Sequence, residues 1–185
     1  IMETLDLTQF KFNLDPGAKF NIDSNIIDDE YKNLDYVIEK FNDSVTLGHW
    51  RNMGYNGTIG GQLCDMRSPQ PTWNNQIVNT FEKLFNWKDV CTSYYKMWPG
   101  SSLPKHQDTY KKYIEVFNLK GQEQSIWRSI VFLEDWQSGH YLEVDGNPYT
   151  QWSKGTVVTW QYDTPHIAAN LGMTPRYTLQ VTGHT

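Results

Sequence analysis

Two side chains that commonly bind metal ions, His106 and Asp108, stand two residues apart in the chain. Residues two apart on a β-strand point to the same face of the sheet, so this imidazole and this carboxylate can converge on one ion. A further ligand must then come from elsewhere in the chain, and the best candidate is His166. Two imidazoles and one carboxylate on one face of an ion favour iron(II) and leave coordination positions open opposite the protein. The sequence therefore predicts a metal site formed by His106, Asp108 and His166.

An arginine, Arg176, follows the last of these ligands by ten residues. If Asn170-Leu171-Gly172 forms a hairpin turn, His166 lies opposite Arg176 and both side chains point to the same face. The planar guanidinium binds a carboxylate through two hydrogen bonds, so an arginine beside open metal positions suits a ligand with two functional ends. Such a ligand chelates the metal at one end and presents a carboxylate at the other. 2-Oxoglutarate is a molecule of this kind.

The elements that must position these residues are short strands, which follow one another from about residue 90 onward. Six segments are rich in β-branched and aromatic residues, as strands usually are. Asp145-Gly146-Asn147-Pro148 is typical of a turn between two of them. Many short strands separated by turns predict an antiparallel sandwich or barrel. The predicted strands cover residues 92–97, 126–133, 140–144, 155–160, 166–170 and 177–181.

The first half of the chain predicts helices and one hairpin. Phe10, Phe12 and Leu14 alternate before a turn at Asp15-Pro16-Gly17, and Phe20 and Ile22 follow, so residues 8–22 are expected to form two short strands. Apolar residues recur at helical spacing over residues 28–41 and 73–85. Both helices are expected to pack their apolar stripes against the sheet.

Residues 47–71 are rich in glycine, asparagine and proline and contain Trp50, Arg51, Tyr55 and Arg67. A loop of this length inside a compact domain is usually functional or mobile. We therefore expect this segment to face the substrate.

Composition limits the class of protein. The 185 residues are enough for one domain, and 15% are aromatic, which favours a packed core over disorder. A net charge of −5 argues against a nucleic-acid partner, and no apolar run has the length of a membrane span. The two cysteines, Cys64 and Cys91, form no metal or redox motif, and no signal peptide is visible. We expect a cytoplasmic protein of a bacterium or a phage-infected cell.

The motifs together resemble those of the Fe(II)- and 2-oxoglutarate-dependent oxygenases. The residues concerned are Pro99-Gly100 before His106 and Asp108, Gly155 eleven residues before His166, and Arg176. The chain looks most like the aspartyl/asparaginyl β-hydroxylase-like and prolyl 4-hydroxylase-like branches, and residues 152–160 are especially similar to the former. The resemblance covers roughly residues 92–183.

This resemblance implies a double-stranded β-helix with iron held by His106, Asp108 and His166 and with 2-oxoglutarate held by Arg176. It also implies further co-substrate contacts from Arg128 and Tyr95. Vertebrate-type aspartyl/asparaginyl enzymes lack the carboxylate ligand, whereas Asp108 is present here, as in the prolyl branch.

Three further side chains lie close to these motifs in sequence. His140 stands where many relatives have a paired glycine, and we interpret it as structural. Trp98 and Trp160 are close enough to the ligands in sequence to form walls of the pocket.

The sequence thus predicts one mainly β domain over residues 1–185, a cupin-like jelly roll. Residues 1–90 would supply supporting helices and the substrate loop, and residues 91–185 the core with the metal site. The predicted function is a dioxygenase that uses Fe(II), 2-oxoglutarate and O2 to hydroxylate a peptide residue or a small polar metabolite, forming succinate and CO2. The alternatives are a non-catalytic, metal-containing binding module and a zinc hydrolase, because three protein ligands and water also describe catalytic zinc. The sequence leaves the oligomeric state open.

Overall fold

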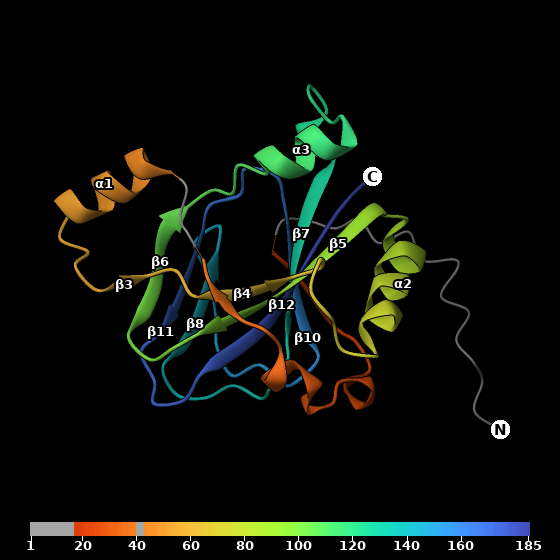
Figure 1. Cartoon of the computed structure of the whole chain (residues 1–185), viewed down its shortest axis with the longest axis horizontal. Coiled ribbons are helices and arrows are strands. Elements are labelled where there is room, and N and C mark those ends of the chain that lie inside the picture. Colours follow the sequence, from red (N-terminus) through yellow and green to blue (C-terminus); the bar gives the residue numbers. More distant parts are fainter. Residues whose placement is uncertain (1–16, 40–42) are drawn as a thin grey trace.

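Two β-sheets face each other and form the body of the protein (Figure 1). The computed structural model describes residues 17–39 and 43–185. In this part of the chain the larger sheet contains, in spatial order, β1 (Ala18–Asn21), β10 (Thr156–Gln161), β7 (Ile126–Phe132), β12 (Arg176–His184), β5 (Lys88–Met97), β4 (Gln62–Asp65) and β2 (Val37–Ile38). The smaller sheet contains β3 (Thr58–Ile59), β6 (Ser101–His106), β11 (His166–Asn170), β8 (His140–Val144) and β9 (Asn147–Tyr149).

Neighbouring strands in these sheets are antiparallel, apart from β3 and β6, which run parallel. The arrangement is a jelly roll, or double-stranded β-helix, and the predicted fold class is confirmed. All six strands predicted after residue 90 are present, whereas β6 and β9 were not predicted. Strands from before residue 90 form both edges of the larger sheet, β1 at one and β4 and β2 at the other.

Of the turn predicted over residues 145–148, Asp145 and Gly146 form the turn, whereas Asn147 and Pro148 belong to strand β9. The two turn residues have positive φ, 49° and 78°, and the flanking residues Val144 and Asn147 are paired across β8 and β9. Two central residues with positive φ are typical of the tight hairpin turns that match the twist of a sheet, and glycine adopts this conformation without steric cost.

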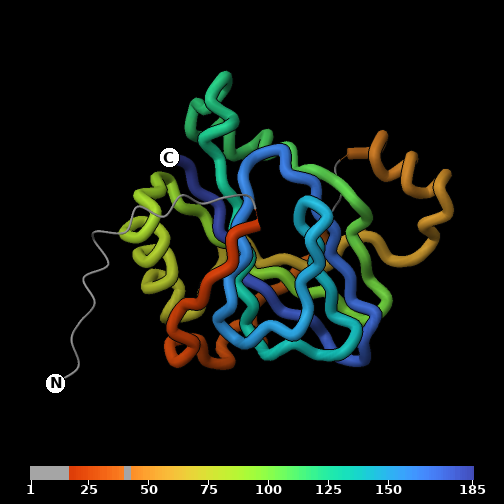
Figure 2. Tube along the Cα trace, turned by 180° about the vertical axis from the view of Figure 1, so that it is seen from behind, coloured from red at the N-terminus to blue at the C-terminus, as the bar shows by residue number. Residues whose placement is uncertain are grey.

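Helix α2 (Asn74–Phe85) covers the outer face of the larger sheet, as predicted for residues 73–85 (Figure 2). Its side chains Ile77 and Phe81 are fully buried and belong to the same apolar cluster as Tyr94 of β5 and Leu179 of β12. The helix ends at Asn86, which adopts the left-handed conformation common at helix C-termini.

Two other helices, α1 (Ser44–Asn52) and α3 (Lys111–Phe117), lie at the end of the jelly roll where β6 ends (Figure 1). Single 3-10 turns occur at Ser24–Ile26, Asp29–Asn33 and Glu123–Ser125. No helix among residues 17–39 and 43–185 has the length and apolar character needed to cross a bilayer.

The helix predicted over residues 28–41 is wrong. The structure has a 3-10 turn at Asp29–Asn33, extended backbone at Leu34, and then strand β2 paired with β4. Val37 and Ile38, expected on the buried stripe, are 61% and 75% exposed. β-Branched side chains favour strands, and pairing with β4 prevails over the helical spacing of the apolar residues.

The expectation of a loop over residues 47–71 is also wrong, because α1, β3 and β4 occupy much of this segment. The carboxylate of Asp43 caps α1 by accepting hydrogen bonds from the backbone N–H groups of Val45 and Thr46. Of the hairpin predicted over residues 8–22, the second strand is present as β1, and Phe10, Phe12 and Leu14 lie outside the described residues.

We predict that Phe81→Ala weakens the packing of α2 on the sheet and lowers the free energy of unfolding by about 3–5 kcal/mol, since it removes a fully buried aromatic ring. Glu82→Ala, at the exposed neighbouring position, is the control and should change it by less than about 0.5 kcal/mol. Urea unfolding monitored by circular dichroism measures both. Equal effects of the two substitutions would contradict the packing of this helix described here.

Candidate metal centre

His106 and His166 are brought together by strand pairing. His106 is the last residue of β6 and His166 the first of β11, and the two are direct partners in the antiparallel ladder. Their ring centroids lie 4.3 Å apart. Asp108 follows β6 by two residues, and its carboxylate oxygens lie 3.8 Å from Nε2 of each imidazole. The candidate ligand atoms of all three residues lie within 4.8 Å of one another.

Backbone carbonyls fix the orientation of both imidazoles. Nδ1 of His106 lies 2.7 Å from the carbonyl oxygen of Pro104, and Nδ1 of His166 lies 3.0 Å from that of Thr164. A carbonyl accepts a hydrogen bond from a protonated Nδ1, so Nε2 of each ring is left with a lone pair for an ion. Burial lowers the pKa of His166 to about 4, which keeps this imidazole neutral at physiological pH.

The carboxylate of Asp108 is held by an arginine from the larger sheet. Nη2 of Arg128 lies 3.3 Å from the Asp108 carboxylate, and Nη1 donates a hydrogen bond of 2.9 Å to Gln180. Burial alone would raise the pKa of Asp108, but Arg128 and the two imidazoles outweigh it and the pKa lies below its ordinary value. Asp108 is therefore ionised, as a metal ligand must be. The predicted contact of Arg128 with 2-oxoglutarate stays a prediction.

Arg176 is the second arginine near the triad, and its side chain has no acidic partner among the described residues. It is 4% exposed, and its guanidinium contacts the Met97 sulfur at 3.3 Å and lies 5.7 Å from the rings of Phe132 and Trp152. Its Nε is buried without a hydrogen-bond partner in the described chain. Burial lowers the pKa of Arg176 to about 10, which leaves it charged at neutral pH. A buried cation without a partner destabilises the folded protein, and an anionic ligand bound beside it would offset that cost.

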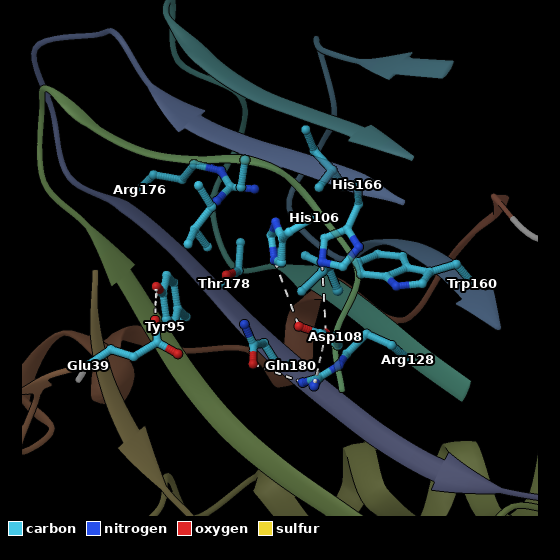
Figure 3. Close-up of a pocket in the computed structure, with 14 residues that line it drawn as sticks. Glu39, Tyr95, His106, Asp108, Arg128, Trp160, His166, Arg176, Thr178 and Gln180 are labelled. Carbon is cyan, nitrogen blue, oxygen red and sulfur yellow. Dashed lines mark hydrogen bonds and ion pairs between the residues drawn. The ribbon is translucent and has the colours of Figure 1, made fainter. Parts of the chain in front are cut away.

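The predicted hairpin between His166 and Arg176 is wrong. Strands β11 and β12 belong to different sheets, where β11 pairs with β6 and β8, and β12 with β5 and β7. The side chain of Asn170 ties the connection between the sheets, donating hydrogen bonds to the carbonyls of Met97 and Thr174. His166 and Arg176 therefore face the same space from opposite sheets, as Figure 3 shows.

That space is a cavity of about 120 Å³ between the inner faces of the two sheets. Alternation along the strands places its polar lining at every second residue, for example Arg176, Thr178 and Gln180 on β12. The remaining lining residues are Glu39, Tyr95, Leu103, His106, Asp108, Arg128, Ile130, Leu142, Trp160, His166 and Ala168.

Tyr95 lines this cavity, and its hydroxyl donates a hydrogen bond to the carboxylate of Glu39. Its contact with a co-substrate stays a prediction. Sequence reasoning missed Glu39, because it is 56 positions from Tyr95 in the chain and follows β2, whereas Tyr95 lies on β5.

Of the two tryptophans expected to form walls of the pocket, one does so. Trp160 lines the cavity, whereas Trp98 is 47% exposed beneath the ammonium of Lys96, so its prediction as a pocket wall is wrong. His140 lies outside the lining, and its Nε2 lies 3.0 Å from the Thr174 carbonyl oxygen, which is the structural role expected for it.

Of residues 47–71, which were expected to face the substrate, Trp50 contacts a member of the triad. Trp50 of α1 lies edge-on to His106, with ring centroids 5.9 Å apart. The guanidinium of Arg51 donates hydrogen bonds to the carbonyls of Tyr55 and Gly57. The guanidinium of Arg67 forms an ion pair with the carboxylate of Asp65.

Comparison with known proteins gives a likeness of fold. No protein-family model matches the sequence, and no curated protein is significantly similar to it. A prolyl-4-hydroxylase of Pseudomonas putida has a similar structure, with a TM-score of 0.58, 13% identity, and coverage of 92% of this chain and 94% of that chain.

Two weaker matches are a cupin domain from Bordetella pertussis and a predicted oxalate decarboxylase from Thermotoga maritima. The cupin domain has a TM-score of 0.40 and 13% identity, over 69% of this chain and 97% of that chain. The predicted oxalate decarboxylase has a TM-score of 0.41 and 14% identity, over 67% of this chain and 80% of that chain. At 13% identity the likeness to the prolyl-4-hydroxylase shows the fold alone, and it agrees with the double-stranded β-helix formed by the two sheets.

We predict that Arg176→Met changes the free energy of unfolding of the metal-free protein by no more than about 1 kcal/mol, or raises it, because a buried charge without a partner is costly. Urea unfolding measures this. Arg128→Met is the matched control and should be destabilising by about 3–5 kcal/mol, since it leaves Asp108 without its cation. A loss of that size for Arg176→Met would mean that Arg176 has an ion-pair partner within the chain.

Proposed function

We propose that the protein is an Fe(II)- and 2-oxoglutarate-dependent oxygenase that hydroxylates an unactivated C–H bond of a peptide residue or a small polar metabolite and releases succinate and CO2. The observation that carries this proposal is the position of Arg176. A buried guanidinium without an acidic partner in the described chain shares one narrow cavity with a His–His–Asp triad. An anion site and a metal site in one cavity suit a small dianion that chelates metal.

The donor set fits iron. His106, His166 and Asp108 would hold the ion, because two neutral imidazoles and one carboxylate are the facial set that suits iron(II) and leaves other positions free. Arg128 orients the carboxylate of Asp108 by an ion pair, and the carbonyls of Pro104 and Thr164 orient the imidazoles.

The inner cavity fits the co-substrate. 2-Oxoglutarate is a small dianion with a keto acid at one end and a carboxylate at the other, and the cavity has the His–His–Asp triad and Arg176 in its lining. With its keto acid at the metal, its far carboxylate would form a charge-assisted pair with Arg176. Thr178, two residues farther along β12, adds a hydroxyl to the same wall. Arg128 and Tyr95 are the further candidates for co-substrate contact.

The bound iron and co-substrate would supply the oxidising chemistry, and the chain supplies binding, orientation and exclusion of water. The apolar side chains Leu103, Ile130 and Leu142 line the cavity between the sheets and limit the access of water. The fold shared with a prolyl-4-hydroxylase is in keeping with this chemistry. Retention of Asp108 favours hydroxylation over halogenation, in which relatives have lost the carboxylate.

A zinc hydrolase is the second candidate, and one observation favours it. The structure brings the carboxylate of Glu39, a candidate general base, to the cavity that contains the triad. In a hydrolase, however, the unpaired cation of Arg176 would have no role. We therefore prefer the oxygenase.

We predict that adding Fe(II) and then 2-oxoglutarate under anaerobic conditions produces a weak visible charge-transfer band from the chelated keto acid. The band should disappear in His166→Ala, which removes a ligand. Arg176→Met should weaken 2-oxoglutarate binding by about 10- to 100-fold, the value of a lost charge-assisted hydrogen bond. Titration of the band measures both effects.

His49→Ala is the matched control, because His49 is exposed on α1 and should leave the band unchanged. Absence of the band from protein that has bound metal would contradict the oxygenase. Hydrolytic activity of the zinc form that is lost in Glu39→Gln would then favour the hydrolase, and its absence the non-catalytic binding module.

A further inference from the structure

A wider hollow adjoins the triad outside the inner cavity. Its volume is about 730 Å³, and it lies between the beginning of α1, the segment after β6, and α3. His106 and Asp108 line both the inner cavity and this outer hollow. If the inner cavity holds the co-substrate beside Arg176, the outer hollow is the space from which a primary substrate reaches the metal.

Among the described residues, Glu39 is the one other side chain that lines both spaces. It therefore stands at their junction, next to two of the candidate metal ligands. Its position is fixed from two sides. Its backbone N–H donates a hydrogen bond of 3.0 Å to the carbonyl of Gly61, and its carboxylate accepts one from Tyr95 (Figure 3).

A close approach of the chain helps to place Glu39. A Cβ atom at Gly61 would lie 2.5 Å from the backbone oxygen of Lys96 and 2.8 Å from the ring of Tyr95. Real Cβ atoms do not approach so closely, so glycine is required here for Gly61 to lie against Tyr95. The carbonyl of Gly61 also accepts the hydrogen bond from the backbone N–H of Glu39. The backbone of Glu39 is thus held by the residue that precedes β4, and its carboxylate by Tyr95 of β5.

The carboxylate of Glu39 has no cationic partner within ion-pair distance among the described residues. The hydrogen bond from Tyr95 goes to Oε2, and Oε1 has no hydrogen bond to the described residues, so it can accept one from a ligand. Burial raises the pKa of Glu39, an effect that the hydrogen bond from Tyr95 opposes. A partly buried carboxylate of this kind is stabilised by a cation that enters with the substrate.

The other charged groups on the wall of the outer hollow give it an acidic character. Asp43 and Asp163 are negative and Lys111 is positive, besides the ligand Asp108. The carboxylate of Asp43 caps α1, and that of Asp163 accepts a hydrogen bond from Gln124. Glu39 is thus the carboxylate that combines contact with both spaces and a free oxygen atom.

We propose that the primary substrate carries a cationic nitrogen group, an ammonium or a guanidinium, and that Glu39 selects it by forming an ion pair. This inference rests on the proposed oxygenase function and adds a substrate class to it. Since Glu39 and the metal ligands line the same junction, the carbon to be hydroxylated would lie close to the cationic group. A substrate with an anionic group at this position would be repelled.

The test uses two matched pairs of probes and a readout that needs no turnover. N-acetyl-L-arginine amide is compared with its citrulline analogue, and N-acetyl-L-lysine amide with its norleucine analogue. Each is titrated anaerobically into the complex with Fe(II) and 2-oxoglutarate, and the shift of the visible band reports binding beside the metal. At least one cationic probe should bind about tenfold or more tightly than its neutral analogue.

Glu39→Gln should abolish this preference and retain the band of the co-substrate complex. Asp163→Asn removes a negative charge from the outer hollow alone and should retain the preference. Equal binding of cationic and neutral probes, or a preference that survives in Glu39→Gln, would overturn the inference and leave the proposed function standing. Loss of the co-substrate band in Glu39→Gln would assign Glu39 to co-substrate binding instead and also overturn it. A wild-type protein without the band would overturn both.

Discussion

The structure depends on the burial of two guanidinium groups between facing sheets. Water solvates a guanidinium well, so each buried arginine needs a compensating anion or tolerates a large desolvation cost. Arg128 has its anion in Asp108, and this pair links β7 of the larger sheet to the segment that follows β6 of the smaller one. Arg176 has none in the described chain. Arg128 therefore balances the charge of the candidate ligand Asp108, and Arg176 is the group for which we propose an anionic ligand.

The jelly roll explains how one cavity can contain both regions. Pairing of β6 with β11 aligns the two histidines, and alternation along β12 points Arg176, Thr178 and Gln180 inward from the opposite sheet. The same alternation on β12 turns Leu179 and Val181 outward, where α2 covers them. A single strand thus supplies both polar groups to the site and apolar groups to the core, so a change of register would damage the two together.

The sequence predicted what local patterns determine and missed what distant pairing determines. The strands after residue 90 and the approach of His106, Asp108 and His166 follow from composition and short motifs. The supposed hairpin from His166 to Arg176 failed because neighbours in sequence can belong to different sheets. Val37 and Ile38 had helical spacing, yet pair with β4. Glu39 carried no motif at all, and its place beside Tyr95 follows from the pairing of β2, β4 and β5.

The most direct test of the central claim is a crystal structure of the anaerobic complex with Fe(II) and 2-oxoglutarate, with data collected at the iron absorption edge. We expect one strong anomalous peak between the Nε2 atoms of His106 and His166 and the carboxylate of Asp108. Density for the co-substrate should run from that peak to the guanidinium of Arg176. Iron bound elsewhere, or a co-substrate whose far carboxylate does not contact Arg176, would contradict the account.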